Sequence, residues 1–193
     1  MKYISLLENK WGKFTKTDHY YANGRMPFVS SKARLNVFFE PLNDEDLDNI
    51  EKMFDCKLPC VLREFYKFSN GCRLFFSGLN IYGLQKNPND IFEPYSLIIE
   101  NQNNDLTIDN SKGFLFGSIG GDYALLLDKN NGKVFVINKS SGKIEKNFDN
   151  FESMFEYFFN ALYDEYDVNC KKKHINKEFS KFPSLAHAII ELP

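Results

Sequence analysis

Hydrophobic residues recur at helical spacing in four stretches of the chain. Residues 2–11 carry apolar side chains three and four positions apart, which predicts a short amphipathic helix. The same spacing predicts helices over about residues 43–55, 59–70 and 149–163. The buried stripe expected for the last of these helices consists of Phe151, Met154, Phe155, Phe158 and Leu162.

Residues at the ends of the predicted helices have the chemistry of caps. Asn43 is a good N-cap, and the acids that follow it favour the positive end of the helix dipole. Pro59 suits the first position of the next helix, and Gly71 suits the left-handed conformation that ends it. We expect Asp149 to cap the final helix, with Glu152 completing a capping box.

Short apolar runs separated by glycine-containing turns occupy most of the chain after Gly71. Such runs are typical of antiparallel strands joined by tight turns. Residues 96–101 predict a short helix between them. The predicted strands are residues 72–76, 79–84, 113–119, 122–128, 133–138 and 143–148. With the helices, these roughly six strands predict an α+β fold in which an antiparallel β-sheet is flanked by helices.

The order of the elements divides the chain into three parts. Residues 43–163 hold most of the predicted helices and strands and are expected to form the main domain. Residues 1–42 are interpreted as an N-terminal extension that begins with the amphipathic helix. Residues 164–193 are interpreted as a C-terminal tail, in which FPSLAHAII predicts a terminal helix.

Composition restricts the class of partner. The 193 residues carry a net charge of −2, whereas a general nucleic-acid binder needs an excess of Lys and Arg. Twenty Phe and ten Tyr predict a bulky core with some rings at the surface as contact residues. Because the chain lacks a bilayer-length apolar run and a secretory signal, we expect a cytoplasmic protein that does not insert into membranes.

The cysteines do not have the spacing of a metal site. They show no CxxC pair and no histidine close enough in sequence to complete a zinc pattern, so we expect reduced and mostly buried thiols. The four residues are Cys56, Cys60, Cys72 and Cys170.

The glycine-rich stretch Gly117–Ile137 looks like a ligand-binding loop at first sight. Its glycines fit neither the Walker motif nor the dinucleotide motif. An EF-hand that starts at Asp128 would need glycine and glutamate where Lys133 and Lys139 stand. Because Asn, Asp and Gly are also the usual turn residues, we interpret the stretch as β-turns and expect no cofactor and no metal.

No catalytic motif is found in the sequence. The three histidines, His19, His174 and His187, lie in the terminal segments, and none belongs to a GxSxG or HExxH motif. The prediction is that the protein is not an enzyme. An enzyme or small-ligand binder that uses the turn at Gly120–Asp122 stays an alternative.

Several short motifs occur in a fixed order. An acidic helix leads to LP at residues 58–59, and an aromatic helix closes on NG at residues 70–71. A GGD turn at residues 120–122 is followed by an apolar strand, Asp128, KVFV and a phenylalanine-rich helix. This order resembles the SUKH superfamily over about residues 40–163. The superfamily includes yeast cell-wall-assembly regulators, the bacterial Syd protein and many bacterial immunity proteins.

The resemblance implies a non-enzymatic domain that binds another protein. In bacteria the usual partner is a toxin, often a nuclease, and the richness in Asn, Lys, Phe and Ile fits a low-GC bacterium. We therefore expect an immunity protein that neutralises a cognate toxin by stoichiometric binding. The alternative is a SUKH-type scaffold or regulator of cell-wall or secretion machinery with no toxin partner.

Acidic residues supply the candidate contact surface. A nuclease toxin carries positive charge around its active site, so acids on the inhibitor would speed association. The alternative is that these acids cap helices or lie on an exposed helix end. The run Lys171–Lys173 is interpreted as a solvated tail rather than a nucleic-acid site. The predicted partner-binding residues are Asp44, Glu45, Asp46, Asp48, Asp122, Tyr123, Asp164, Glu165 and Asp167.

Overall fold

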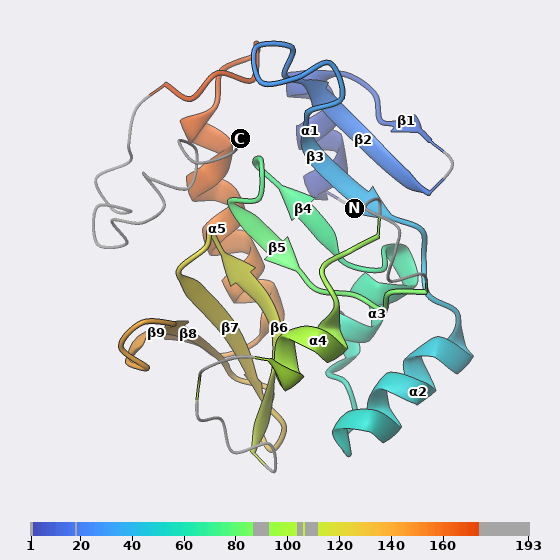
Figure 1. The fold of residues 1–193 in the computed structure, drawn as a ribbon, viewed down its shortest axis with the longest axis vertical. Helices are drawn as coiled ribbons and strands as arrows, with labels where there is room; N and C mark the ends of the chain where they lie inside the picture. Colours follow the sequence, from blue (N-terminus) through green and yellow to red (C-terminus); the bar gives the residue numbers. More distant parts are fainter. Residues whose placement is uncertain (1, 18, 87–92, 104–105, 107–111, 174–193) are drawn as a thin grey trace.

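The computed structural model describes residues 2–17, 19–86, 93–103, 106 and 112–173 (Figure 1). Within this part of the chain, runs of two to four strands are separated by one or two helices, as expected for an α+β fold. The helices are α1 (Lys2–Trp11), α2 (Asp44–Phe54), α3 (Cys60–Phe68), α4 (Leu97–Gln102) and α5 (Phe151–Glu165). The strands are β1 (Thr15–Lys16), β2 (Tyr20–Arg25), β3 (Arg34–Phe39), β4 (Cys72–Leu74), β5 (Leu79–Ile81), β6 (Gly113–Ile119), β7 (Tyr123–Asp128), β8 (Val134–Asn138) and β9 (Ile144–Phe148).

The strands form one antiparallel sheet in which spatial order equals sequence order, with β1 and β9 at the edges. The sequence-based strand count was too low, because the nine strands include β1, β2 and β3, which were not recognised. Val37 of β3 lies opposite Arg73 of β4, so these three strands continue the main sheet. The predicted fold class is confirmed.

Buried amides explain why β2 and β3 do not look like strands in the sequence. Asn36 Nδ2 donates to Asn23 Oδ1 at 3.0 Å, and both residues are buried. Asn23 Nδ2 donates to the backbone carbonyls of Leu7 and Gly12, while Asn36 Oδ1 accepts from the Phe75 backbone amide. Polar groups with such partners can be buried at little cost, although they interrupt the alternation that identifies a strand.

The predicted cap of α2 is confirmed and that of α5 is wrong. Asn43 and Asp46 form a reciprocal capping box at the start of α2. At α5 the Asn150 side chain, rather than Asp149, accepts from the backbone amide of Ser153 at 2.9 Å. Both adjacent residues have cap chemistry, and the extended backbone of Asn150 places only its side chain at the helix end.

Helix α5 covers one face of the sheet, where it passes behind the strands in Figure 1, and α4 lies on the opposite face. The predicted apolar stripe of α5 is confirmed, because every one of its five residues is buried. Pro59 is the N-cap of α3 rather than its first helical residue, so the helix begins one residue later than predicted. The short helix predicted at residues 96–101 is present as α4, with Ser96 as its N-cap.

The terminal segments pack on the same core as the rest of the described chain. Trp11 Nε1 donates to the Asp167 carbonyl at 2.7 Å, and the Tyr3 ring lies 4.6 Å from the Phe159 ring of α5. The domain limits at residues 42 and 163 stay a prediction, and the predicted terminal helix lies outside the described residues. Among the described helices, none has the length and hydrophobicity needed to cross a bilayer.

Candidate functional site

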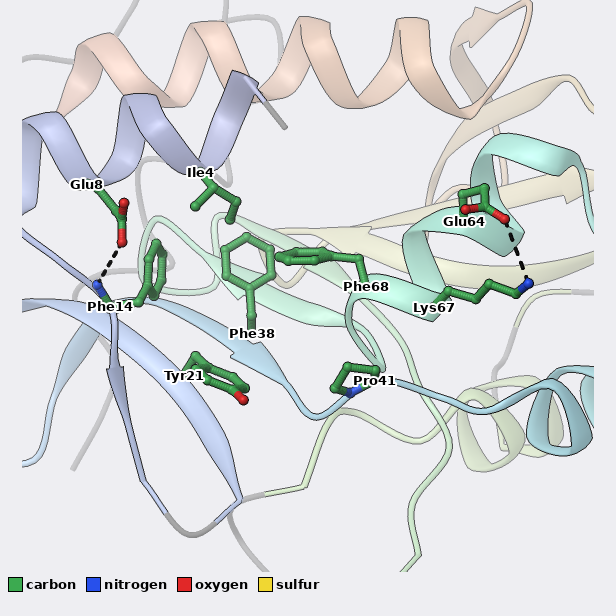
Figure 2. Close-up of a pocket in the computed structure, with 9 residues that line it drawn as sticks. All are labelled: Ile4, Glu8, Phe14, Tyr21, Phe38, Pro41, Glu64, Lys67 and Phe68. Carbon is green, nitrogen blue, oxygen red and sulfur yellow. Dashed lines mark hydrogen bonds and ion pairs between the residues drawn. The ribbon is translucent and has the colours of Figure 1, made fainter.

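A groove of about 490 Å³ lies between α1, β2, β3 and α3. Figure 2 shows side chains from all four elements pointing toward one space. Most of the lining is apolar, with charged groups only at the two ends. The lining residues are Ile4, Glu8, Phe14, Tyr21, Phe38, Pro41, Glu64, Lys67 and Phe68.

Three phenylalanine rings form the centre of the groove. The buried Phe38 of β3 makes edge-to-face contacts with Phe14 at 5.4 Å and with Phe68 at 5.3 Å. Phe14 and Phe68 are only half-buried, so the outer parts of their rings face the groove. Such a surface can bind apolar side chains of another molecule, because contact removes exposed aromatic area from water.

Charged groups close each end of the groove. At one end, the Glu8 carboxylate accepts from Lys13 Nζ at 3.1 Å and from the Phe14 amide at 3.3 Å. The hydrogen bond from Lys13 and that from the Phe14 amide hold the pKa of Glu8 below its usual value. At the other end, Lys67 Nζ lies 3.9 Å from Glu64 and 3.1 Å from Asp44. The groove therefore ends at the acidic first turn of α2.

The predicted acids of α2 lie together, but basic side chains partly neutralise them. Arg63 Nη2 contacts Asp44 at 3.0 Å and Asp48 at 3.2 Å. Asp46 pairs with Lys86 at 3.1 Å and also caps the helix. The hydrogen bond from Lys67, supported by Arg63, lowers the pKa of Asp44.

Glu45 is exposed at the start of the same helix. Of the four predicted acids in this part of α2, it is the one for which no ion pair is found among the described residues. The acidic turn thus keeps one uncompensated carboxylate beside three that basic partners already hold.

The predicted contact residues at the β6–β7 turn, Asp122 and Tyr123, do not supply an exposed aromatic ring. Tyr123 is only 3% exposed, so its ring is part of the core and is removed from the candidate surface. Asp122 is half-buried, and its backbone carbonyl accepts from the Lys139 amide at 2.8 Å. This carbonyl joins the β6–β7 turn to the β8–β9 turn.

The predicted acids near the end of α5 have three different environments. Asp164 is exposed, whereas Glu165 is buried and pairs with Lys172 at 2.9 Å. Asp167 Oδ1 accepts from the backbone amides of Asn169 and Lys171, each at 2.8 Å. Burial removes Glu165 from the candidate surface, and Asp167 holds a local turn.

The two groups of predicted acids do not form one site. Figure 1 shows α2 at the lower right and the end of α5 at the upper left, on opposite sides of the molecule. Sequence reasoning missed the groove, because its lining comes from residues 4–41 and residues 64–68, which only the tertiary fold brings together. The clustering of Phe and Tyr was the signal available in the sequence.

The turn interpretation of Gly117–Ile137 is confirmed. Asp128 Oδ1 accepts from the Asn130 amide at 2.8 Å, and Gly132 has φ of 72°, as a tight turn requires. The repeated turn ten residues later has the same chemistry, since Asn138 Oδ1 accepts from two following amides. In the part of the chain that the structure describes, no group of three or more potential metal ligands lies together.

The four cysteines are free thiols with different burial. Cys72 and Cys170 are buried as expected, and burial raises the pKa of Cys170 to about 11. Cys56 is half-buried and Cys60 is exposed, so the expectation of mostly buried thiols holds for only two residues.

Comparison with known proteins identifies a family for this arrangement. No curated protein matches the chain. The family model described as SMI1 / KNR4 family (SUKH-1) matches residues 41–157, which is more than half of the 193 residues. This match covers α2 to the middle of α5, includes one wall of the groove, and confirms the resemblance to SUKH proteins. The chain belongs to the SMI1/KNR4 family (SUKH-1).

Proposed function

We propose that this protein acts by binding another protein, and that its partner is a bacterial toxin that it neutralises stoichiometrically. The observation that carries the proposal is the aromatic groove that ends at the acids of α2. Protein interfaces combine a desolvated aromatic centre with a charged rim, and this groove has both.

The proposed occupant is a toxin segment with apolar side chains followed by Lys or Arg. The apolar side chains would contact Phe14, Phe38 and Phe68, while the basic groups would approach Glu45 and Glu64. A nuclease toxin would supply such basic groups, because it must hold phosphates. Since basic side chains already hold three acids of α2, the groove would contribute more to affinity than the acidic turn.

The two walls of the groove have different origins in the sequence. Phe68 and Lys67 belong to the matched residues 41–157, whereas Ile4 and Phe14 precede them. A surface built partly outside the family core suits selectivity for one partner, because changes in the N-terminal wall would alter the groove without changing the core.

The proposed mode of action is binding without catalysis. The polar side chains of the groove lining are Glu8, Tyr21, Glu64 and Lys67, and a nucleophilic mechanism would need one of them within hydrogen-bond reach of a free base. The Glu8 carboxylate already accepts two hydrogen bonds, and Lys67 is paired with Asp44.

The second candidate function is a regulator or scaffold of cell-wall or secretion machinery. The description of the matching family, SMI1 / KNR4, favours it, because the yeast cell-wall-assembly regulators belong to the same superfamily. The same groove would then hold a resident host protein rather than a toxin.

Capture of the partner separates the two candidates. The tagged full chain is incubated with lysate of its native host at low salt, and bound proteins are eluted with increasing salt and identified by mass spectrometry. Recovery of a multidomain protein whose C-terminal region is toxic when expressed alone, and whose toxicity the chain suppresses, is the expected result. Recovery of only wall-synthesis or secretion components would contradict the toxin proposal and favour the regulator.

A further inference from the structure

Two loops form an end of the molecule that lies far from α2. One loop connects β2 to β3 through residues 26–33, and the other follows α5 through residues 167–173. They meet at the top of Figure 1. Cys170 of the second loop lies close to the end of β2 that leads into the first loop, since a Cβ added to Gly24 would lie 3.1 Å from Cys170 Sγ. We call residues 25–34 together with residues 167–173 the basic end.

Large apolar side chains are exposed at the basic end. Phe28 is 54% exposed, Val29 is 45% exposed and Val168 is 69% exposed. Residues at a loop tip are usually small or polar, and two consecutive large apolar residues there bury little surface within the chain. Exposed apolar groups of this kind indicate a surface that contacts another phase or molecule.

The charge around these side chains is predominantly positive. Residues 19–39 contain no Asp or Glu, and neither do residues 168–173. Asp167 is the one acid of the basic end and accepts from two backbone amides, while the nearby Glu165 pairs with Lys172 and Asp164 is exposed. The exposed cations for which no ion pair is found within the described part of the chain are Arg25, Lys32, Lys171 and Lys173.

We propose that the basic end attaches the protein to the surface of an anionic lipid bilayer. Phe28 and Val29 enter the headgroup region, while the four cations contact lipid phosphates. Apolar insertion and electrostatic attraction together are the two signals that give stable surface binding. The chain lies on the bilayer in this arrangement and does not span it.

The positions of the other charges fit this orientation. The acids of α2 lie at the opposite side of the molecule, so they would face away from the anionic surface (Figure 1). The groove is lined by α1 and α3 and shares no residue with the basic end, so attachment would leave it open to a partner. The inference therefore does not depend on the proposed function.

Co-sedimentation with vesicles tests the inference on the full chain. We expect binding to vesicles of phosphatidylcholine and phosphatidylglycerol in equal amounts, and none to vesicles of phosphatidylcholine alone. Phe28→Ser should weaken the binding about tenfold through the lost apolar contact. Lys32→Glu and Lys171→Glu should each weaken it about fivefold or more through lost attraction to the lipid charge.

Two matched variants on the distant β9 hairpin serve as controls. Ile144→Ser removes an apolar side chain that is 59% exposed, and Lys143→Glu reverses an exposed cation. Both should bind vesicles like the unchanged chain. All variants carry surface substitutions, and circular dichroism with thermal unfolding checks their folding.

Three outcomes overturn the inference. The first is no binding to the mixed vesicles. The second is a loss of vesicle binding in the β9 controls that equals the loss in the variants of the basic end. The third is weaker vesicle binding by the charge variants without weaker binding by Phe28→Ser, together with binding of the unchanged chain to duplex DNA that is as strong as its binding to the vesicles. This result would indicate a general polyanion surface instead of a lipid surface.

Discussion

Lys67 Nζ of α3 lies 3.1 Å from the carboxylate of Asp44 in α2, and the same lysine lines the groove. One side chain thus connects the apolar surface to the acidic turn that the sequence predicted as a contact site. A partner that binds in the groove would contact Lys67 and Asp44 together. A substitution at either residue should therefore change the electrostatic environment of the other.

The pKa of Asp44 should depend mainly on Lys67. Lys67→Met removes the largest cause that lowers the pKa of Asp44, so this pKa should rise toward its ordinary value of 3.8 while Arg63 still holds it partly down. NMR titration of the side-chain carboxyl carbon measures the shift. Lys52→Met, on the same helix as Asp44, is the control and should leave the pKa unchanged; an equal effect of both variants would contradict the assignment.

The sign of the linked stability follows from the direction of that shift. Because the folded-state pKa of Asp44 lies below its unfolded value, the stabilisation is present above the unfolded pKa. It is lost as the pH falls through the lowered pKa. Lys67→Met should therefore flatten the acid side of the stability curve.

Glu51 should matter far more to stability than its exposed neighbours on α2. It is 7% exposed and accepts from Lys57 at 2.6 Å, from the Leu58 amide at 3.1 Å and from Arg63 at 3.1 Å. Glu51→Ala leaves a buried amide and a cation without their acceptor, which should cost about 3 kcal/mol in the free energy of unfolding.

Urea unfolding at neutral pH measures this loss, and Glu45→Ala should change the stability by less than about 0.5 kcal/mol. Burial raises the pKa of Glu51, but the hydrogen bonds from Lys57 and the Leu58 amide outweigh it, so the pKa is lowered. The unchanged protein should therefore lose stability in acid, and Glu51→Ala should lose less. Parallel acid curves for both proteins would disprove this role.

Two glycines with similar backbone angles should respond differently to alanine. Gly71 has φ of 82° and Gly142 has φ of 68°. An added Cβ at Gly71 would lie 2.4 Å from the Ile81 carbonyl oxygen, whereas nothing lies within 4 Å at Gly142. Gly142→Ala should cost about 1 kcal/mol for the left-handed backbone alone.

Gly71→Ala should cost about 3 kcal/mol or more, because the backbone must also move. Chemical unfolding of the two variants side by side tests the difference. Equal losses would mean that backbone conformation, rather than the close contact with β5, determines the need for glycine at residue 71.

The cap of α5 can be tested at two adjacent residues. Asn150→Ala removes the side-chain acceptor for the Ser153 amide and should cost about 1 kcal/mol. Asp149→Ala should lower the free energy of unfolding by only a few tenths of a kcal/mol, because Asp149 is not the N-cap. Thermal unfolding of both variants measures the difference, and the reverse order would restore the sequence-based assignment.

The helices and the strands after Gly71 could be predicted because local signals agree with the tertiary fold there. Asn43 caps α2, the five apolar residues of α5 share one face, and glycine turns separate the strands of the meander. Where local chemistry and packing favour the same structure, the periodicity of apolar residues is sufficient to predict the element.

The remaining strands and the groove could not be predicted for physical reasons. Asn23 and Asn36 are buried polar residues whose partners lie in other elements, and they interrupt the apolar pattern of β2 and β3. The groove exists only because α1 and α3 pack beside the same strands. The acids of α2 are neighbours in the sequence, whereas their basic partners Arg63 and Lys86 are distant in sequence, so the ion pairs could not be predicted from the local pattern.

The groove itself is tested by two substitutions on one helix. Ile4 and Leu6 are both partly exposed on α1, but only Ile4 lines the groove. Ile4→Asp places a charge among the phenylalanine rings and should weaken binding of the captured partner at least tenfold, which is about 1.4 kcal/mol. Leu6→Asp introduces the same charge outside the groove and should change the affinity by less than about twofold.

Calorimetric titration measures both values, and thermal unfolding checks that each variant stays folded. Equal affinities for the two variants would place the contact surface elsewhere and leave the groove as a feature of packing.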